Sequence, residues 1–274
     1  MADALLAVEA LRKEFGSAVA VDDVSFAVEP GASLAIVGES GSGKSTCARM
    51  VVGLERPTAG RIAVDGDTWS VAGRVSRRER LRRGRKVQMV FQDPYLSLDR
   101  RQTVRACLAE CLDLHFDLDR GAREARIRQL LDQVGLDERQ ARALPRALSG
   151  GQRQRVAIAR ALAAEPRLLI LDEAVAALDV SIQAQVLNVL ADIRAATGIA
   201  FLFISHDLAV VRQVCDEVLV LHRGRVVERG DVDAVLEAPR DPYTRRLIDS
   251  VPRPGWTPRR RRSTTPEPTP ETPA

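Results

Sequence analysis

The strongest indication of the fold is the segment Gly38-Glu39-Ser40-Gly41-Ser42-Gly43-Lys44-Ser45, which Thr46 follows. A short apolar run, Ser33–Val37, comes before it, and helical spacing continues after it over Lys44–Val52. Glycines at this density let consecutive backbone N–H groups turn inward around phosphates, and the start of the helix adds a favourable dipole. We therefore expect residues 38–46 to form an ATP-binding phosphate loop, with Lys44 reaching the β- and γ-phosphates and the Ser45 hydroxyl binding Mg²⁺. A glycine-rich surface turn with a solvated lysine is the alternative, and the flanking strand and helix argue against it.

Strand and helix signals alternate along the rest of the chain. The expected strands are Leu5–Leu11, Val19–Val28, Arg61–Val64 with a hairpin turn at Asp65-Gly66, Val87–Phe91, Arg167–Asp172, Ile199–Ile204, Val218–Leu221 and Arg225–Glu228. The expected helices are Thr103–Asp113, Gly121–Val134, Ser149–Ala164, Ser181–Ala195 and Leu208–Cys215. This alternation predicts an α/β fold with a mainly parallel sheet, helices on both of its faces and a helical insertion over about residues 93–166.

The composition indicates a globular domain followed by a tail. Apolar residues make up 45% of the chain and charged residues 28%, an ordinary balance. We expect residues 1–251 to form one domain and the Pro- and Arg-rich residues 252–274 to be a flexible tail. The tail carries most of the net charge of +4, and a nearly neutral body argues against a dedicated nucleic-acid binder. The arginine-rich stretch Arg74–Lys86 could form a nucleic-acid patch. However, Glu79 interrupts it and no aromatic residues alternate with the arginines, so we favour a solvated helix or turn.

Cysteine usage and the N-terminus indicate a reducing compartment. The cysteines are Cys47, Cys107, Cys111 and Cys215, and none forms a CxxC pair. We interpret them as free thiols. The first residues, Met1-Ala2-Asp3-Ala4, lack the basic region of a signal peptide, and no apolar run approaches the roughly 18 residues that span a bilayer. The sequence therefore predicts a cytoplasmic protein that reaches a membrane only through a partner.

Two carboxylates stand at the end of the apolar run Leu168–Leu171. In open α/β sheets, ligands bind at the carboxyl ends of the strands. We expect Asp172 to hold Mg²⁺ and Glu173 to act as the general base for an attacking water. Acidic residues often simply terminate strands, and it is the presence of the phosphate loop that favours the functional interpretation.

A second glycine-rich segment, Leu148-Ser149-Gly150-Gly151-Gln152, opens the helix Ser149–Ala164. A structural explanation accounts for the serine as an N-cap and for one glycine that eases helix entry. It leaves the second glycine unexplained, because glycine weakens the start of a helix. A bare helix N-terminus suits a phosphate, so we expect Ser149, Gly150, Gly151 and Gln152 to bind ATP.

These three motifs, in this order and spacing, closely resemble those of the ABC ATPases, over about residues 5–250. The resemblance implies an ABC ATPase fold, in which a RecA-like, mainly parallel core carries an antiparallel β subdomain and an inserted helical subdomain. It also implies that each ATP lies between two chains. Ser149 and Gly151 would then come from a second ATPase subunit, either another copy or a paralogue.

The resemblance assigns further residues. Gln92 matches the Q-loop, which contacts Mg²⁺ and the attacking water and senses the transmembrane partner. His206, after the strand Ile199–Ile204, matches the switch histidine that contacts the γ-phosphate. Phe15 matches the aromatic residue that stacks on adenine, although a phenylalanine near a strand end is more often part of the core. Asp179 matches the D-loop.

Two positions depart from the family pattern. Ala174 stands where the family usually has proline, and Ala176 where it usually has serine. The D-loop serine contacts the facing subunit, so we expect communication across the dimer to be altered. The residues assigned to the chemistry are unaffected.

Four segments resemble the peptide-uptake subgroup of the family: Phe91–Leu98, Ala159–Leu162, Ala177–Ser181 and Pro239–Arg245. After the first of them, Asp99 and Arg100 replace the usual Asn and Pro. The last segment belongs to a C-terminal extension over about residues 231–251. The subgroup serves oligopeptides, dipeptides and nickel, and some members carry a cysteine cluster near the C-terminus. No cysteine follows Cys215, which excludes an iron–sulfur site of that kind.

The resemblance therefore implies the ATP-hydrolysing, energy-coupling subunit of an importer, which uses ATP and Mg²⁺ on the cytoplasmic face of the inner (plasma) membrane. Its expected partners are transmembrane permease subunits and, indirectly, an extracytoplasmic solute-binding protein. Di- or oligopeptides are the expected cargo. The alternatives are an importer ATPase for nickel or another small solute, and a soluble ABC ATPase of repair or translation. Repair-type members carry long coiled-coil insertions and translation-type members usually two motif sets, and this chain has neither.

Overall fold

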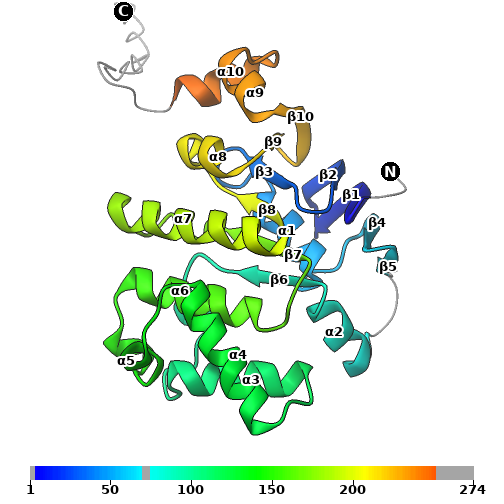
Figure 1. Ribbon diagram of the computed structural model, residues 1–274. Helices are drawn as coiled ribbons and strands as arrows, with labels where there is room; N and C mark the ends of the chain where they lie inside the picture. The colour runs from blue at the N-terminus through cyan, green and yellow to red at the C-terminus, as the bar shows by residue number, and fades with distance from the viewer. Residues whose placement is uncertain (1–3, 70–74, 251–274) are drawn as a thin grey trace, which may run out of the picture.

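The computed structural model describes residues 4–69 and 75–250, which form two β-sheets surrounded by helices (Figure 1). The larger sheet has the strand order β10-β9-β3-β8-β7-β6. Its strands are β3 (Ser33–Val37), β6 (Val87–Val90), β7 (Leu168–Asp172), β8 (Ala200–Ile204), β9 (Glu217–His222) and β10 (Arg225–Asp231). All neighbouring strands are parallel except β9 and β10, which form an antiparallel hairpin. The predicted mainly parallel core is confirmed.

The central strands are buried on both faces because their alternate residues enter two different cores. In β8, Phe201 and Phe203 belong to one core, and Leu202 and Ile204 belong to the other. The helices that cover the first core are α6 (Gly150–Leu162), α7 (Val180–Thr197) and α8 (Leu208–Val214), and the second is covered by α1 (Lys44–Val52). Continuous apolar runs are typical of parallel strands with helices on both sides.

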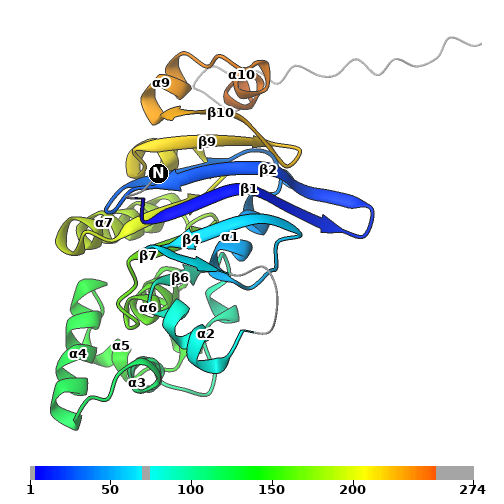
Figure 2. The same ribbon diagram turned by 90° about the vertical axis from the view of Figure 1, so that its right-hand side faces the viewer.

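The smaller sheet is antiparallel and closes the second core. Its strand order is β2-β1-β4-β5, with β1 (Leu6–Phe15), β2 (Ala18–Val28), β4 (Ala59–Val64) and β5 (Asp67–Trp69). Figure 2 shows β2, β1 and β4 side by side, with α1 next to them. Leu6, Val8 and Leu11 are completely buried in the core that this sheet shares with α1. The expected hairpin is confirmed, because Asp65 and Gly66 both have positive φ, as a tight two-residue turn requires.

The expected helical insertion lies between β6 and β7 and forms the green block at the bottom of Figure 1. Besides α6, its elements are the 3₁₀ turn η1 (Pro94–Leu96), α3 (Val104–His115), α4 (Arg120–Gln133), α5 (Glu138–Ala141) and the 3₁₀ turn η2 (Pro145–Ala147). Each helix begins at a capping side chain, in turn Thr103, Asp119, Asp137 and Ser149, whose oxygen accepts a hydrogen bond from a backbone N–H of the first turn.

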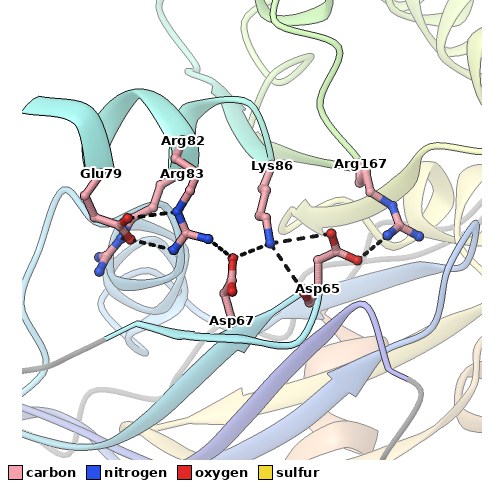
Figure 3. A network of polar contacts seen from close by, with 7 residues as sticks. All are labelled: Asp65, Asp67, Glu79, Arg82, Arg83, Lys86 and Arg167. Atoms are coloured by element: carbon pink, nitrogen blue, oxygen red, sulfur yellow. Dashed lines mark hydrogen bonds and ion pairs between the residues drawn. The ribbon is translucent and has the colours of Figure 1, made fainter.

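The arginine-rich stretch before β6 contains the surface helix α2 (Arg77–Gly84), which has no buried residue. A network of ion pairs joins this helix to the antiparallel sheet and to the start of β7 (Figure 3). Asp67 of β5 accepts from both Arg82 and Lys86, and Asp65 pairs with Arg167. Three of the seven basic residues described in this stretch, Arg82, Arg83 and Lys86, are thus in ion pairs within the chain. The stretch forms the expected surface helix, and part of its charge is neutralised. Arg74 lies outside the described residues.

Two helices follow β10: α9 (Val232–Glu237) and α10 (Pro242–Asp249). Both pack against β10, at the top of Figure 1. In residues 4–69 and 75–250, no helix is both long enough and apolar enough to cross a bilayer. The predicted tail, residues 252–274, lies outside the described residues.

Candidate active site

The sheet brings three of the sequence motifs to one edge. The parallel strands β3, β8 and β7 are neighbours in that order. The phosphate loop, residues 38–43, follows β3, and Glu173 follows β7 directly. Ser205 and His206 follow β8. Because carboxyl ends of parallel strands meet at the same edge, residues more than 160 apart in the sequence become neighbours there.

The glycines of the phosphate loop are required by the backbone. Gly38 has φ 150°, and a Cβ on it would lie 2.2 Å from the carbonyl oxygen of Leu221 in β9. Gly43 has φ 105°, and a Cβ there would lie 2.4 Å from the carbonyl oxygen of Ala20 in β2. Gly43 also precedes α1 without any side-chain cap, so the first N–H groups of that helix stay available. Such a loop is suited to an anion.

Lys44 lies within this loop. Its side chain is only 5% exposed, and its Nζ donates to the carbonyl oxygens of Gly38 and Glu39, at 2.8 Å each. Burial lowers the pKa of Lys44, while the nearby carboxylates Glu173 and Asp172 act in the opposite direction. The ammonium is therefore held where the triphosphate is expected, by contacts that phosphate oxygens could replace.

Ser45 and Asp172 present paired oxygens to the same place. The Ser45 hydroxyl donates to Oδ1 of Asp172 at 2.8 Å. Burial raises the pKa of Asp172, which is only 7% exposed, while the hydrogen bond from Ser45 acts in the opposite direction. A buried carboxylate beside a hydroxyl is an all-oxygen donor set of the kind that Mg²⁺ prefers, so these residues fit the predicted metal-binding role.

Glu173 and His206 lie opposite each other. Nδ1 of His206 is 3.4 Å from Oε1 of Glu173. Glu173 has φ 49°, a left-handed conformation unusual for a residue with a side chain, and its N–H donates to the carbonyl oxygen of Ile204 at 3.0 Å. The backbone of Glu173 is thus held against the end of β8, beside His206. Gln92 is exposed and follows β6, the strand next to β7.

The second glycine-rich segment has a packing role that the sequence did not reveal. Ser149 caps α6 and forms a capping box with Gln152, whose side chain accepts from the Ser149 N–H. A Cβ on Gly151 would lie 2.3 Å from Cγ2 of Ile182 in α7. The expectation that the second glycine has no structural reason is therefore wrong. Gly150 has no such constraint, because its nearest neighbour, Leu178, would lie 3.6 Å away.

The start of α6 is separate from the phosphate loop of its own chain. Ser149 is exposed, and no hydrogen bond joins residues 149–152 to residues 38–46 in the part of the chain that the structure describes. Asp179, the N-cap of α7, is exposed and makes no side-chain capping bond. Of the two departures from the family pattern, Ala174 is buried in the first core and Ala176 is exposed.

Phe15 lies at the exposed end of the β1–β2 hairpin. Its side chain is 50% exposed, which rules out the core alternative. The ammonium of Lys13 lies 4.7 Å from the centre of its ring. The same hairpin comes close to the phosphate loop at Ala20, whose carbonyl oxygen would lie 2.4 Å from a Cβ on Gly43. Stacking of adenine on Phe15 stays a prediction.

Two supports of the phosphate loop were missed from the sequence. The N–H of Gly224, in the β9–β10 turn, donates to the carbonyl oxygen of Ser42 at 2.9 Å. The N–H of Glu39 donates to the hydroxyl of Tyr243, 204 positions away, at 2.9 Å. The only signal for Tyr243 was the segment Pro239–Arg245, which resembles the subgroup extension without indicating a contact.

Comparison with known proteins agrees with this geometry. Residues 21–176 match the family model described as ABC transporter, and residues 227–273 match the one described as oligopeptide/dipeptide transporter, C-terminal region. The oligopeptide transport ATP-binding protein OppF of Bacillus subtilis is 43% identical over 259 residues, 93% of this chain and 84% of that protein. The di/tripeptide transport ATP-binding protein DppF of Pseudomonas aeruginosa is 48% identical over 233 residues, 85% of this chain and 71% of that protein.

A solved structure is also similar. It is the ATP-binding cassette MJ0796 in a dimeric, post-hydrolysis state bound to ADP and Pi. It superimposes with a TM-score of 0.74 at 27% identity, over 83% of this chain and 98% of the other.

Proposed function

Because the chain belongs to the ABC transporter family, whose ATP-binding subunits hydrolyse ATP, we propose that it is the energy-coupling ATPase of an importer for di- or oligopeptides. The observation that carries the cargo class is the match of residues 227–273 to the oligopeptide/dipeptide C-terminal region. Relatives named for oligopeptide and di/tripeptide transport support it over most of the chain. Nickel or another small solute is the alternative cargo.

The residues at the sheet edge have the positions that phosphoryl transfer to water needs. Lys44 moves from the loop carbonyls to the β- and γ-phosphates. Ser45, Asp172 and Gln92 would hold Mg²⁺, which would neutralise phosphate charge when bound. Glu173 accepts a proton from water as the water oxygen attacks the γ-phosphorus and the bond to the bridging oxygen breaks. ADP leaves with that oxygen, and His206 donates a hydrogen bond to the departing phosphate.

Each site is completed by a second ATPase subunit. Ser149, Gly150 and Gly151 make no hydrogen bond to their own phosphate loop among the described residues, which supports their use in trans. Val180, beside Asp179, is 82% exposed, so an apolar side chain is available for burial in a paired state. The dimeric state of the similar cassette bound to ADP and Pi agrees with pairing.

The segment after Gln92 is the part of the chain suited to a transmembrane permease. Tyr95 in η1 lies under the guanidinium of Arg153, which is 4.5 Å from the ring centre. Arg153 belongs to α6 and donates to the carbonyl oxygen of Leu148. A permease helix that contacts Tyr95 could therefore move Arg153, and through it the backbone at Leu148, directly before Ser149. The chain would work on the cytoplasmic face of the membrane, and a solute-binding protein outside would select the peptide.

A mixing experiment tests the pairing. A Lys44→Ala chain combined with a Ser149→Arg chain forms one intact site and one doubly damaged site per mixed dimer. ATPase activity should reappear on mixing, although each variant is inactive alone. The mixture should be repeated with a paralogous ATPase partner if one is encoded. Continued inactivity with both partners would contradict use of Ser149 in trans.

A knockout tests the biological task. Loss of di- or oligopeptide uptake, with the protein recovered on a membrane permease, is the expected result. The purified chain should bind no peptide by calorimetry, because the cargo is recognised elsewhere. Lost nickel uptake with normal peptide uptake would assign the alternative cargo. Recovery on ribosomes or DNA without a membrane partner would refute the transport function.

A further inference from the structure

The C-terminal extension reaches the phosphate loop through one side chain. Tyr243, near the start of α10, is 5% exposed, and its hydroxyl accepts the Glu39 N–H at 2.9 Å. The ring packs on His222 at the end of β9, with 3.8 Å between the ring centres. A buried hydroxyl that accepts a single backbone N–H from a catalytic loop is more specific than packing requires.

The bonded N–H belongs to a peptide unit that is held at both ends. Its carbonyl is that of Gly38, which accepts from Nζ of Lys44 at 2.8 Å. Its N–H is that of Glu39, which Tyr243 holds. Tyr243 and Lys44 therefore bind opposite ends of the same peptide unit. The orientation of this peptide unit determines the position of the Lys44 ammonium.

The position of the hydroxyl is fixed by a closed circuit of contacts. Asp241 caps α10 by accepting from the Tyr243 N–H at 2.7 Å, and the Asp241 N–H donates to Glu228 of β10 at 3.1 Å. Glu228 lies opposite Val220 of β9, and Val220 lies opposite Val37, the last residue before the phosphate loop. The route from β3 through β9, β10 and α10 thus returns to the phosphate loop (Figure 1).

Other backbone N–H groups of the phosphate loop stay available for a ligand. The next peptide unit is also held, because the N–H of Ser42 donates to the carbonyl oxygen of Glu39 at 3.2 Å. A rotation of the Gly38–Glu39 peptide would turn the Glu39 backbone and disturb this contact. In the described part of the chain, the N–H groups of Gly41, Gly43 and Lys44 have no acceptor. These are the groups that a phosphate would use.

We propose that Tyr243 is a positioning residue for ATP, through which the oligopeptide/dipeptide C-terminal region holds the Gly38–Glu39 peptide in its phosphate-binding orientation. The proposal rests on the ATP site proposed above and goes beyond it, because it gives the C-terminal extension a direct role in nucleotide binding. Tyr243 acts through the loop peptide that its hydroxyl holds.

Removal of the hydroxyl tests the proposal with the full chain. Tyr243→Phe keeps the ring on His222 but leaves the Glu39 N–H without its acceptor. Affinity for MgATP, measured by calorimetry, should fall roughly fivefold to thirtyfold, the effect of one lost hydrogen bond at a partly buried donor. Amide hydrogen exchange at Glu39 should become faster in the same variant.

A matched control separates this effect from loosening of α10. Ile248→Ala removes a buried side chain from the same helix without touching the hydroxyl. It should lower the melting temperature more than Tyr243→Phe does, while MgATP affinity stays within about twofold of the unmodified chain. Equal losses of affinity in the two variants would overturn a specific role for the hydroxyl.

Further outcomes decide the remaining cases. If Tyr243→Phe does not fold, Glu228→Ala replaces it in the test. This variant removes the acceptor of the Asp241 N–H before α10 and keeps the Tyr243 hydroxyl, and it should also weaken MgATP binding. Unchanged affinity in the folded variant, while Lys44→Ala abolishes binding, would overturn the Tyr243 proposal alone. An unmodified chain that binds no MgATP would overturn the ATP site as well.

Discussion

Gly151→Ala is the substitution whose outcome the structure predicts most directly. The added methyl group would lie 2.3 Å from Cγ2 of Ile182, against the 3.4 Å at which ordinary contact begins. Either α6 and α7 separate by about 1.1 Å, or Ile182 leaves its present position. Ile182 is half-buried, so it can give way only at the cost of its packing.

Two effects of this substitution oppose each other. Overpacking of a well-packed contact costs about 1–3 kcal/mol. Alanine regains up to about 1 kcal/mol over glycine in a helix, and less near the helix start, where residue 151 lies. The net loss in free energy of unfolding should therefore be about 1 kcal/mol. For a domain of this size that corresponds to a fall in melting temperature of about 2–4 °C.

A double-mutant cycle with Ile182→Ala isolates the contact. Ile182→Ala removes Cγ2 and with it the overpacking, so Gly151→Ala should cost no stability in that background. The coupling energy should equal the overpacking cost, about 1–3 kcal/mol. Thermal unfolding of the four proteins, followed by circular dichroism, measures it. An unchanged or raised melting temperature for Gly151→Ala, or additive effects in the double variant, would refute the packing argument.

The same double variant separates packing from catalysis. If its stability recovers and its ATPase activity does not, the bare surface of Gly151 is also needed by the facing subunit. Recovery of both would assign this glycine to packing alone.

Three further predictions concern the site and its coupling. Glu173→Gln should abolish steady-state phosphate release, because an amide accepts no proton, while ATP still drives pairing on size-exclusion chromatography; near-normal turnover would remove Glu173 from its role. Burial raises the folded-state pKa of Asp172, so its charge costs stability at neutral pH and the cost disappears as pH falls through that pKa. Without nucleotide, Asp172→Asn should therefore have a higher melting temperature than the unmodified protein at pH 7, and the difference should become smaller toward pH 4. A difference in melting temperature that does not change with pH would contradict this. Tyr95→Ala should lower peptide uptake in cells while the purified chain keeps its basal hydrolysis, since the Arg153 contact is lost and the nucleotide site is left whole; an equal loss of both would argue against a coupling role.

Local pattern was sufficient for most of the fold. The runs that became β3, β7 and β8 are short, apolar and bounded by turn residues, which is how strands covered on both faces read. The four-residue helix α5 and the three-residue strand β5 were not predicted, because such short elements contain too few residues for a period to show. Helices α9 and α10 also escaped prediction, since each has at most eight residues and is stabilised mainly by packing on its neighbours.

The sequence predicted the candidate site only where its chemistry depends on residues that are adjacent in the chain. Lys44 and Ser45 belong to a loop whose glycines adopt backbone angles that few other residues allow, so local sequence and function coincide there. For Gly151 the sequence supported a phosphate role and concealed a packing role, because the neighbour that explains it, Ile182, lies in another helix.

Periodicity and backbone preference act over a few residues, so the chain's chemical groups and most of its strands, helices and turns could be identified from the sequence. Which of these groups meet depends on the tertiary structure. Strand order places His206 3.4 Å from Glu173, and the return of α10 to the sheet places Tyr243 against Glu39. Such contacts depend on the register and packing of segments far apart in the chain, and no local pattern records them.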